Sequence, residues 1–352
     1  MRTVRTPAEV YRNFGEAEAA GASPLYGRIA VALSESDEAL RALEAAPARR
    51  RQPPLVLAAL HDLALAGRAP ALASAFAAGD GDAAAGAAID VLLRMTDAVV
   101  DTVARRPLWT IDSGPCAVLY PAVAEAAHRA GAGAVGLIGV GTSAGVQVDR
   151  VGISYGDGAA LGDASSPVQL SALIVGGRPV PRQAIPEVVA RISVDPDPLD
   201  LTIEDDARWL RACVEPDRPE RVARLEAELA LARAAPPLLL RGDPVEVLPD
   251  AVAQVPADAL PVVTTAWALT ALSPDRRLRL LHRLDEAAAG RPVAWVSAEG
   301  VGVAPAVPTL GDRHASGHSI LGLVLLDAST IRAEAVGRCW SRGRLLAWLA
   351  GS

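Results

Sequence analysis

The chain has 352 residues, a net charge of −7 and 51% hydrophobic residues, few of them aromatic. This length suits one large α/β domain with a smaller helical one, and the acidic balance argues against a nucleic-acid partner. All 34 basic residues are arginine. The lack of lysine excludes Schiff-base catalysis, anchoring of pyridoxal phosphate and a Walker-A phosphate loop.

The sequence predicts a cytoplasmic protein. No stretch approaches the roughly 20 apolar residues of a membrane-spanning helix, and the N-terminal segment lacks the apolar core of a signal peptide. Cys116, Cys213 and Cys339 are an odd number of cysteines without metal-ligand spacing, which favours a reducing compartment. We therefore expect neither a membrane segment nor a bound metal.

In the first part of the chain, apolar residues recur every three or four positions, which predicts helices. These Ala- and Leu-rich stretches cover residues 35–46, 54–66 and 84–105, and Gly and Pro separate them. We expect residues 1–106 to form a helical domain, or cap, beside an α/β domain formed by residues 107–352.

From residue 107 onward, strand-like runs alternate with helix-like runs. The predicted strands are 134–140, 168–175, 237–240, 260–265 and 292–297. The predicted helices are 115–131, 204–234 (one or two helices) and 274–289. Such alternation predicts a mostly parallel, doubly wound sheet.

Two β-like runs end the chain, Ser319 to Leu326 and Ile331 to Cys339. The connection between them is too short for a crossover, so we expect an antiparallel hairpin. A mostly parallel, Rossmann-like sheet that ends in such a hairpin is the topology associated with class I methyltransferases.

The strand at 134–140 runs into a glycine-rich turn, AVGLIGVGTSAG. Gly139, Gly141 and Gly145 permit a sharp turn and a close approach of the backbone to a ligand. The pattern resembles motif I of class I methyltransferases, in which an acidic residue stands two positions before the first turn glycine. That position is Gly139 here, so part of the cofactor chemistry is missing.

Short motifs are spread over residues 24 to 300. They are SPLY (23–26), LVLAALHDL (55–63), GPC (114–116), SAG (143–145), YG (155–156), DPLD (197–200), DDARWLRA (205–212), GD (242–243) and EG (299–300). Together they resemble an actinobacterial family known as domain of unknown function 2332. The pair DPLD…DDARWLRA is the most specific, and the resemblance implies a methyltransferase-like fold.

The departures from this family concern carboxylates. Family members carry a glutamate at the position of Gly139 and an acidic residue near the end of the second strand. We place that strand at 168–175, where the chain reads Ala172-Leu173-Ile174. Such carboxylates hold the amino-acid and ribose parts of the cofactor, so the resemblance implies weak or absent binding of S-adenosylmethionine.

Ligands of doubly wound sheets bind at the carboxyl ends of the strands, which predicts one crevice there. Asp112 and Glu299 are its candidate general bases, although an ion pair with arginine would explain either carboxylate equally well. Gly141, Thr142 and Ser143 would hold an anionic group of the substrate. Ordinary helix capping by Ser143 is the alternative interpretation of this turn.

The other candidate substrate contacts are Arg150, Arg241, Asp243, Thr265, Trp267 and His61. Either arginine could complete a bidentate clamp on an anion. His61 lies on the apolar stripe of a predicted helix, where a core role is the alternative. Asp195 and Asp197 belong to an acidic patch before a predicted helix, which helix capping and the helix dipole explain.

Three hypotheses for the function follow. In the first, the chain is an enzyme of bacterial specialised metabolism that needs no S-adenosylmethionine and no other cofactor. An amine of the substrate would expel an anionic ester and close a small ring such as an aziridine. The second hypothesis is a methyltransferase that uses S-adenosylmethionine on a small molecule. The third is a non-catalytic subunit that supports a protein partner or forms a homo-oligomer.

Overall fold

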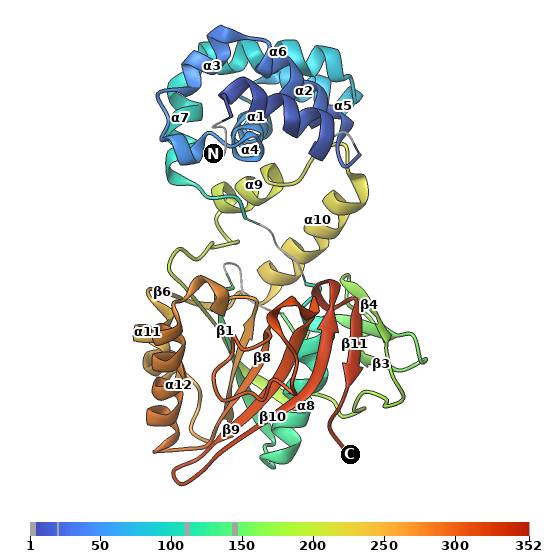
Figure 1. Cartoon of the computed structure of the whole chain (residues 1–352), viewed down its shortest axis with the longest axis vertical. Coiled ribbons are helices and arrows are strands. Elements are labelled where there is room, and N and C mark those ends of the chain that lie inside the picture. The colour runs from blue at the N-terminus through green and yellow to red at the C-terminus, as the bar shows by residue number, and fades with distance from the viewer. Residues whose placement is uncertain (1–4, 20, 110–112, 143–146, 352) are drawn as a thin grey trace. The chain divides into compact units, whose positions relative to one another are not determined.

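The computed structural model of the chain describes residues 5–19, 21–109, 113–142 and 147–351 (Figure 1). The chain divides into two compact units. Unit 1 comprises Met1–Ile111 and Ile203–Glu226, and unit 2 comprises Asp112–Thr202 and Ala227–Ser352. Each unit is therefore built from two separate stretches of sequence.

Unit 1 is a bundle of helices. Its helices are α1 (Pro7–Asn13), α2 (Pro24–Ser34), α3 (Asp37–Leu43), α4 (Pro53–Leu65), α5 (Pro70–Ala78), α6 (Gly81–Arg94), α7 (Thr96–Arg105), α9 (Glu204–Ala212) and the first part of α10 (Pro219–Ala234). Short π and 3-10 turns lie at Phe14–Ala19 and Ala48–Arg50. Several helices begin at a polar cap, because Ser23, Ser36 and Asp80 each accept a hydrogen bond from a backbone N–H of the first turn.

The helices predicted at 35–46 and 54–66 are confirmed as α3 and α4, and the stretch 84–105 forms two helices rather than one. The break falls at Met95, whose backbone leaves the helical region. Next to it, the hydroxyl of Thr96 donates to the carbonyl of Leu92 at 2.8 Å. A side chain that bonds to the preceding turn in this way commonly bends a helix.

Helix α4 lies at the centre of unit 1 and is buried along most of its length. Its apolar residues join a core that also contains the fully buried Trp209 of α9. Among the described residues, no single helix is long and apolar enough to cross a membrane. The helices α4 and α5 reach that length and composition only together, as a pair bent by 104°.

Unit 2 contains one large sheet. Its strands are β1 (Ala134–Val140), β2 (Gly152–Tyr155), β3 (Ala160–Gly162), β4 (Gln169–Ile174), β5 (Glu187–Asp195), β6 (Leu238–Arg241), β7 (Leu260–Ala266), β8 (Val293–Gly300), β9 (Ser319–Leu326), β10 (Ile331–Trp340) and β11 (Leu345–Trp348). They are ordered β3-β2-β4-β11-β10-β9-β8-β7-β1-β5-β6. The block from β6 to β8 is parallel.

Helices cover both faces of this parallel block. On one face, α8 (Cys116–Arg129) packs against alternate residues of β1, β7 and β8. On the other face, α11 (Pro244–Ala253) and α12 (Pro274–Ala288) pack against the intervening residues. The strands are apolar on both faces because both faces are covered. The fold is therefore the predicted α/β class, a mostly parallel sheet with a helical N-terminal region.

The strand beside β1 corrects one prediction. The run 168–175 does form a strand, β4, but β4 pairs with β2 and β11 and not with β1. The neighbour of β1 is β5, Glu187–Asp195, which the apolar pattern did not predict. Polar residues alternate with apolar ones along β5 and a proline-rich segment precedes it, so the strand lacks the continuous apolar run of its neighbours.

The C-terminal hairpin is confirmed. β9 and β10 are antiparallel, and β9 pairs directly with β8, the strand that precedes it in the chain. The short strand β11, which was not predicted, continues the sheet beyond β10 and joins it to β4. A 3-10 turn at Ser341–Gly343 connects β10 to β11.

Candidate functional site

The order of the strands defines where a ligand would bind. After β1 the chain first forms β2, β3 and β4 at the far edge of the sheet. Within the parallel block, β5 and β6 then lie on one side of β1, and β7 and β8, which follow them in the chain, lie on the other side. The direction of winding therefore reverses between β1 and β7. In open α/β sheets, ligands bind outside the carboxyl ends of the strands at such a reversal.

The turn that leaves β1 requires a glycine. Gly141 has a φ of +69°, and a Cβ atom at this position would lie 2.6 Å from the Cβ of Ala268. Ala268 belongs to the segment that follows β7. A side chain at position 141 would therefore force apart the ends of the two strands at the point where the winding reverses.

A row of polar side chains lies on one face of β5. Arg191, Ser193 and Asp195 are alternate residues and so share a face, whereas Ile192 and Val194 belong to the apolar core on the other face. Arg191 pairs with Asp149, and the fully buried Ser193 Oγ lies 3.2 Å from Thr142 Oγ1. The row leads to the carboxyl end of the sheet.

Thr142 occupies the space beside Gly139. Gly139 is in register with Ser193, and a Cβ atom at position 139 would lie 2.6 Å from Thr142 Oγ1. The hydroxyl of Thr142 therefore lies where the acidic side chain expected at position 139 would begin. A side chain at 139 requires Thr142 to move.

We expect Gly139→Ala to lower the free energy of unfolding by about 1–3 kcal/mol, because the added methyl group overpacks this site. In the background of Thr142→Ala, the same change should cost about 1 kcal/mol less, since the obstructing hydroxyl is gone. Urea denaturation of the four proteins of this cycle measures the coupling. Gly133→Ala is the control, because a Cβ there meets nothing within 4 Å. Equal costs in both backgrounds would contradict the contact.

Asp195 ends β5 as a buried carboxylate, only 6% exposed. Burial raises its pKa, although the backbone N–H of Asp197, which donates to it at 2.9 Å, opposes that shift. Its register partner on β6 is Arg241, whose side chain is 65% exposed and whose guanidinium pairs with Asp197. The strand next to β1 therefore does end in a carboxylate, which corrects the expectation drawn from Ala172-Leu173-Ile174.

Asp243, Trp267 and Thr265 have structural partners. Asp243 caps α11 by accepting a hydrogen bond from the N–H of Val245 at 2.9 Å, and it pairs with Arg276. Trp267 follows β7 in a left-handed conformation, and its Nε1–H donates to Ser319 Oγ at 2.8 Å. Thr265 and Ser319 are buried. The hydroxyl of Thr265 accepts a hydrogen bond from the indole N–H of Trp295, which is buried in β8.

Glu299 is buried at the carboxyl end of β8, with 1% of its surface exposed. Its Oε1 accepts hydrogen bonds from the backbone N–H groups of Ala268 and Leu269, at 3.1 and 3.2 Å. Its Oε2 is buried without a hydrogen-bond partner among the described residues. Burial raises the pKa of this carboxyl group to about 7, against the opposing effect of the two N–H groups. The side chain thus anchors the segment after β7.

We expect Glu299→Gln to gain stability relative to the native protein as pH rises. A folded-state pKa near 7, above the ordinary value of 4.5, means that the folded state binds the proton more tightly than the unfolded state. The native protein therefore loses stability between about pH 4.5 and 7. Glutamine keeps the oxygen that accepts the two N–H groups but does not titrate.

The difference in unfolding free energy between the two proteins should shift by about 1–3 kcal/mol in favour of the glutamine variant between pH 4.5 and 8. Denaturation at both pH values measures it. The control is Leu278→Ala on α12, which replaces an exposed residue that does not titrate. Its difference in unfolding free energy from the native protein should not change with pH. Parallel stability curves for the native and glutamine proteins would contradict the burial of an ionisable group.

The remaining predicted site residues are placed as follows. Asp112 and Ser143 lie outside the described residues. Arg150 of unit 2 donates to the carbonyl of Leu231 at 2.7 Å. His61 belongs to unit 1, where its Nδ1 lies 3.2 Å from the hydroxyl oxygen of Tyr26 in the core, and burial lowers its pKa to about 4. Thr142, Asp195 and Arg241 are the polar groups at the carboxyl ends of β1, β5 and β6.

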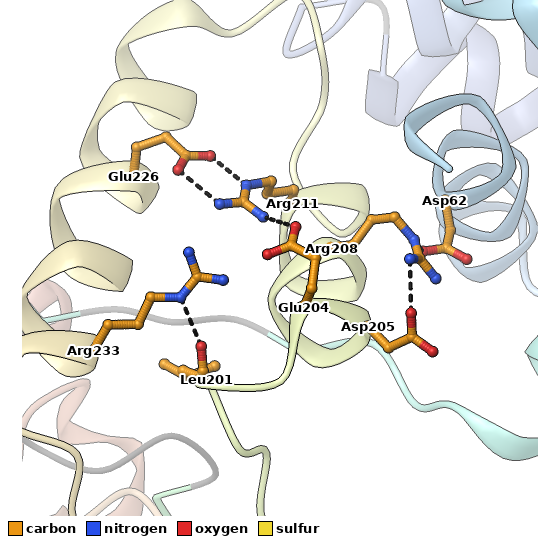
Figure 2. Close-up of polar contacts among 8 residues, drawn as sticks. All are labelled: Asp62, Leu201, Glu204, Asp205, Arg208, Arg211, Glu226 and Arg233. Carbon is orange, nitrogen blue, oxygen red and sulfur yellow. Dashed lines mark hydrogen bonds and ion pairs between the residues drawn. The ribbon is translucent and has the colours of Figure 1, made fainter. Parts of the chain in front are cut away.

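The most specific motif, DDARWLRA, has a structural role in unit 1 (Figure 2). Arg208 of α9 bonds to Asp62 of α4 at 2.9 Å, which joins this motif to LVLAALHDL. Arg211 pairs with Glu226 of α10 at 2.6 Å and with Glu204 of α9 at 2.8 Å. Figure 2 shows its guanidinium between these two carboxylates. The pairs with Asp62 and Glu226 attach α9 to α4 and α10, whereas the pair with Glu204 lies within α9.

The parallel sheet with helices on both faces makes unit 2 a Rossmann-like α/β unit. Polar groups lie at the carboxyl edge of this sheet, near the point between β1 and β7 where the winding reverses. Among the residues that the structure describes, no three His, Cys, Asp or Glu side chains gather as a metal site would require. The model of the family described as "Uncharacterized protein conserved in bacteria (DUF2332)" matches residues 8–348, and the chain belongs to this family. No curated protein and no solved structure matches the chain.

Proposed function

We propose that the chain is an enzyme of bacterial specialised metabolism that closes a small nitrogen ring, such as an aziridine, without S-adenosylmethionine. The observation that supports this most is the pair of opposite charges, Asp195 and Arg241, in register at the ends of β5 and β6. A substrate with an ammonium group next to a sulfate or phosphate ester carries the complementary pair of charges.

The chemistry is an intramolecular displacement at carbon. Asp195 takes a proton from the ammonium group of the substrate, and its raised pKa makes it a stronger base than an exposed aspartate. The nitrogen lone pair then attacks the neighbouring carbon, so that a C–N bond forms while the C–O bond of the ester breaks. The sulfate or phosphate leaves with the bonding electrons.

Arg241 would stabilise the leaving anion. Its ion pair with Asp197 is exposed, and exposed pairs contribute little to stability, so the guanidinium is available to a substrate. A guanidinium matches the oxygens of a sulfate or phosphate in a bidentate arrangement. Most of the rate enhancement would come from holding the nitrogen in line with the breaking bond.

Asp195 also favours a second candidate, a methyltransferase that uses S-adenosylmethionine. A carboxylate at the end of the strand next to the first one is where Rossmann-like folds accept a hydrogen bond from a ribose hydroxyl. Gly139 argues against this candidate, because the acidic residue that would hold the amino-acid part is missing and Thr142 fills its place.

One pair of measurements separates the candidates. Calorimetric titration with S-adenosylmethionine and S-adenosylhomocysteine tests the donor site, and release of inorganic sulfate from 2-aminoalkyl sulfate esters tests ring closure. Sulfate release without donor binding supports the proposed enzyme. Micromolar donor affinity, about 8 kcal/mol, would favour the methyltransferase. If the protein neither binds the donor nor releases sulfate, the third hypothesis, a non-catalytic subunit, remains.

A further inference from the structure

Unit 2 contains a cavity of about 630 Å³ away from the candidate site. Its walls include Trp348 at the end of β11 and the segment that connects β4 to β5. Since β9, β10 and β11 alternate in direction after β8, β11 ends at the edge of the sheet where β8 begins. The cavity therefore lies at the amino edge of the parallel strands, opposite the carboxyl ends described above.

Hydrogen bonds hold the cavity walls in place. The guanidinium of Arg178 donates to the carbonyl of Leu349, which ties the connecting segment to the chain after β11. The N–H of Ile185 donates to the hydroxyl of Tyr120 on α8 at 3.4 Å. The N–H groups of Leu349 and Ala350 both donate to the carbonyl of Val336 on β10. The cavity is thus bordered by segments fixed at several points.

The lining is apolar with a cationic rim. Val180, Trp348 and Ala350 are buried members of the core on the α8 side, and prolines 179 and 181 stand on either side of Val180. Arg182 is exposed at the rim, and within the described part of the chain it has neither an ion pair nor a hydrogen bond. An apolar pocket of this size with a few charged groups is typical of small-molecule sites.

The charge of the lining favours an anion. Among the described lining residues, Glu125 is the one acidic side chain; it is buried and pairs at 2.6 Å with Arg129, which also pairs with Glu334 of β10. Arg178 and Arg182 remain as the charges at the opening. An indole ring and two proline rings offer flat apolar surfaces on which an aromatic or alicyclic body can pack.

We propose that this cavity binds a small carboxylate with an aromatic or bulky apolar body, its carboxylate on Arg182 and its body against Trp348. The site is independent of the ring-closing function proposed above, because it lies at the other edge of the sheet. Arg178 is already engaged with a backbone carbonyl and serves mainly to hold the wall, whereas Arg182 supplies the free charge.

Ligand-observed NMR and calorimetry with three probes, 2-naphthoate, 3-phenylpropionate and cyclohexanecarboxylate, test this site. We expect saturable binding of at least one carboxylate and about 2- to 5-fold weaker binding of its neutral amide, the usual size of an exposed ion pair. Arg182→Gln should weaken the carboxylate by a similar factor. Arg332→Gln, which removes an exposed arginine from β10, is the control with the same net charge and should bind normally.

The location is tested with 5-fluorotryptophan. The ¹⁹F signal that disappears in Trp348→Phe identifies Trp348, and the carboxylate should shift that signal in the otherwise native protein. The proposal is overturned if no probe saturates, if amide and carboxylate bind equally, if Arg332→Gln weakens binding as much as Arg182→Gln, or if the Trp348 signal does not move.

Discussion

Trp209→Ala is expected to lower the free energy of unfolding of unit 1 by about 3–5 kcal/mol, the usual cost of emptying a fully buried tryptophan site. The indole has no exposed surface and lies in the core around α4. Its N–H donates to the carbonyl of Pro107 at 2.9 Å, and the guanidinium of Arg106 lies 5.8 Å from the ring centre. The substitution removes the packing and both polar contacts together.

Denaturation followed by circular dichroism measures this effect, since unit 1 is helical. Trp209→Phe should cost less, about 1–3 kcal/mol, because most of the volume remains while the hydrogen bond to Pro107 is lost. Leu65→Ala, a half-exposed apolar change at the end of α4, is the control and should stay near 0.5 kcal/mol. A loss below about 1 kcal/mol for Trp209→Ala would mean that the DDARWLRA motif does not hold this unit together.

Asp195→Asn is expected to lower the rate of sulfate release by about 10²–10⁴-fold, the usual contribution of a general base. The fold should be preserved at neutral pH. Burial raises the pKa of this carboxyl group, so the folded state disfavours its charge and a neutral amide of the same shape removes that cost. With the native protein, the rate of sulfate release should rise with pH as Asp195 loses its proton.

The control for this substitution is Asp258→Asn, an exposed aspartate in the turn before β7. It changes the net charge equally and should leave turnover unchanged. Unaltered turnover in Asp195→Asn would assign the base to another carboxylate, with Asp112 and Glu299 as the remaining candidates. Loss of S-adenosylmethionine binding in Asp195→Asn, with no sulfate release by the native protein, would support the methyltransferase.

The parallel block of unit 2 could be predicted from the sequence wherever a strand is apolar on both faces. β1, β7 and β8 are buried on both sides by helices, so their sequences are continuous apolar runs. β5 was not predicted as a strand, because one of its faces carries the row of polar side chains that ends in Asp195. The feature that hides this strand from the apolar pattern is the feature that places polar chemistry at the site.

The details of the site depend on contacts between segments that are distant in the sequence. Asp195 is interpreted as part of a helix start when only its neighbours in the chain are considered, and its position beside Arg241 follows from the pairing of β5 with β6. The role of Glu299, which the sequence predicts to be a base, also depends on contacts between distant segments. Its bonds to the backbone of Ala268 and Leu269 are visible only once β7 and β8 lie side by side.

The divided composition of unit 1 has a consequence for synthesis on the ribosome. The first stretch of the unit, Met1–Ile111, emerges without α9, which belongs to the second stretch, Ile203–Glu226. Part of the apolar surface of α4 therefore stays uncovered while the ribosome synthesises the residues of β1 to β5. It is covered only after Arg208 and Trp209 of α9 have been synthesised. A nascent chain in this state exposes an apolar helix face for several seconds at ordinary elongation rates, which is the interval in which a chaperone would act.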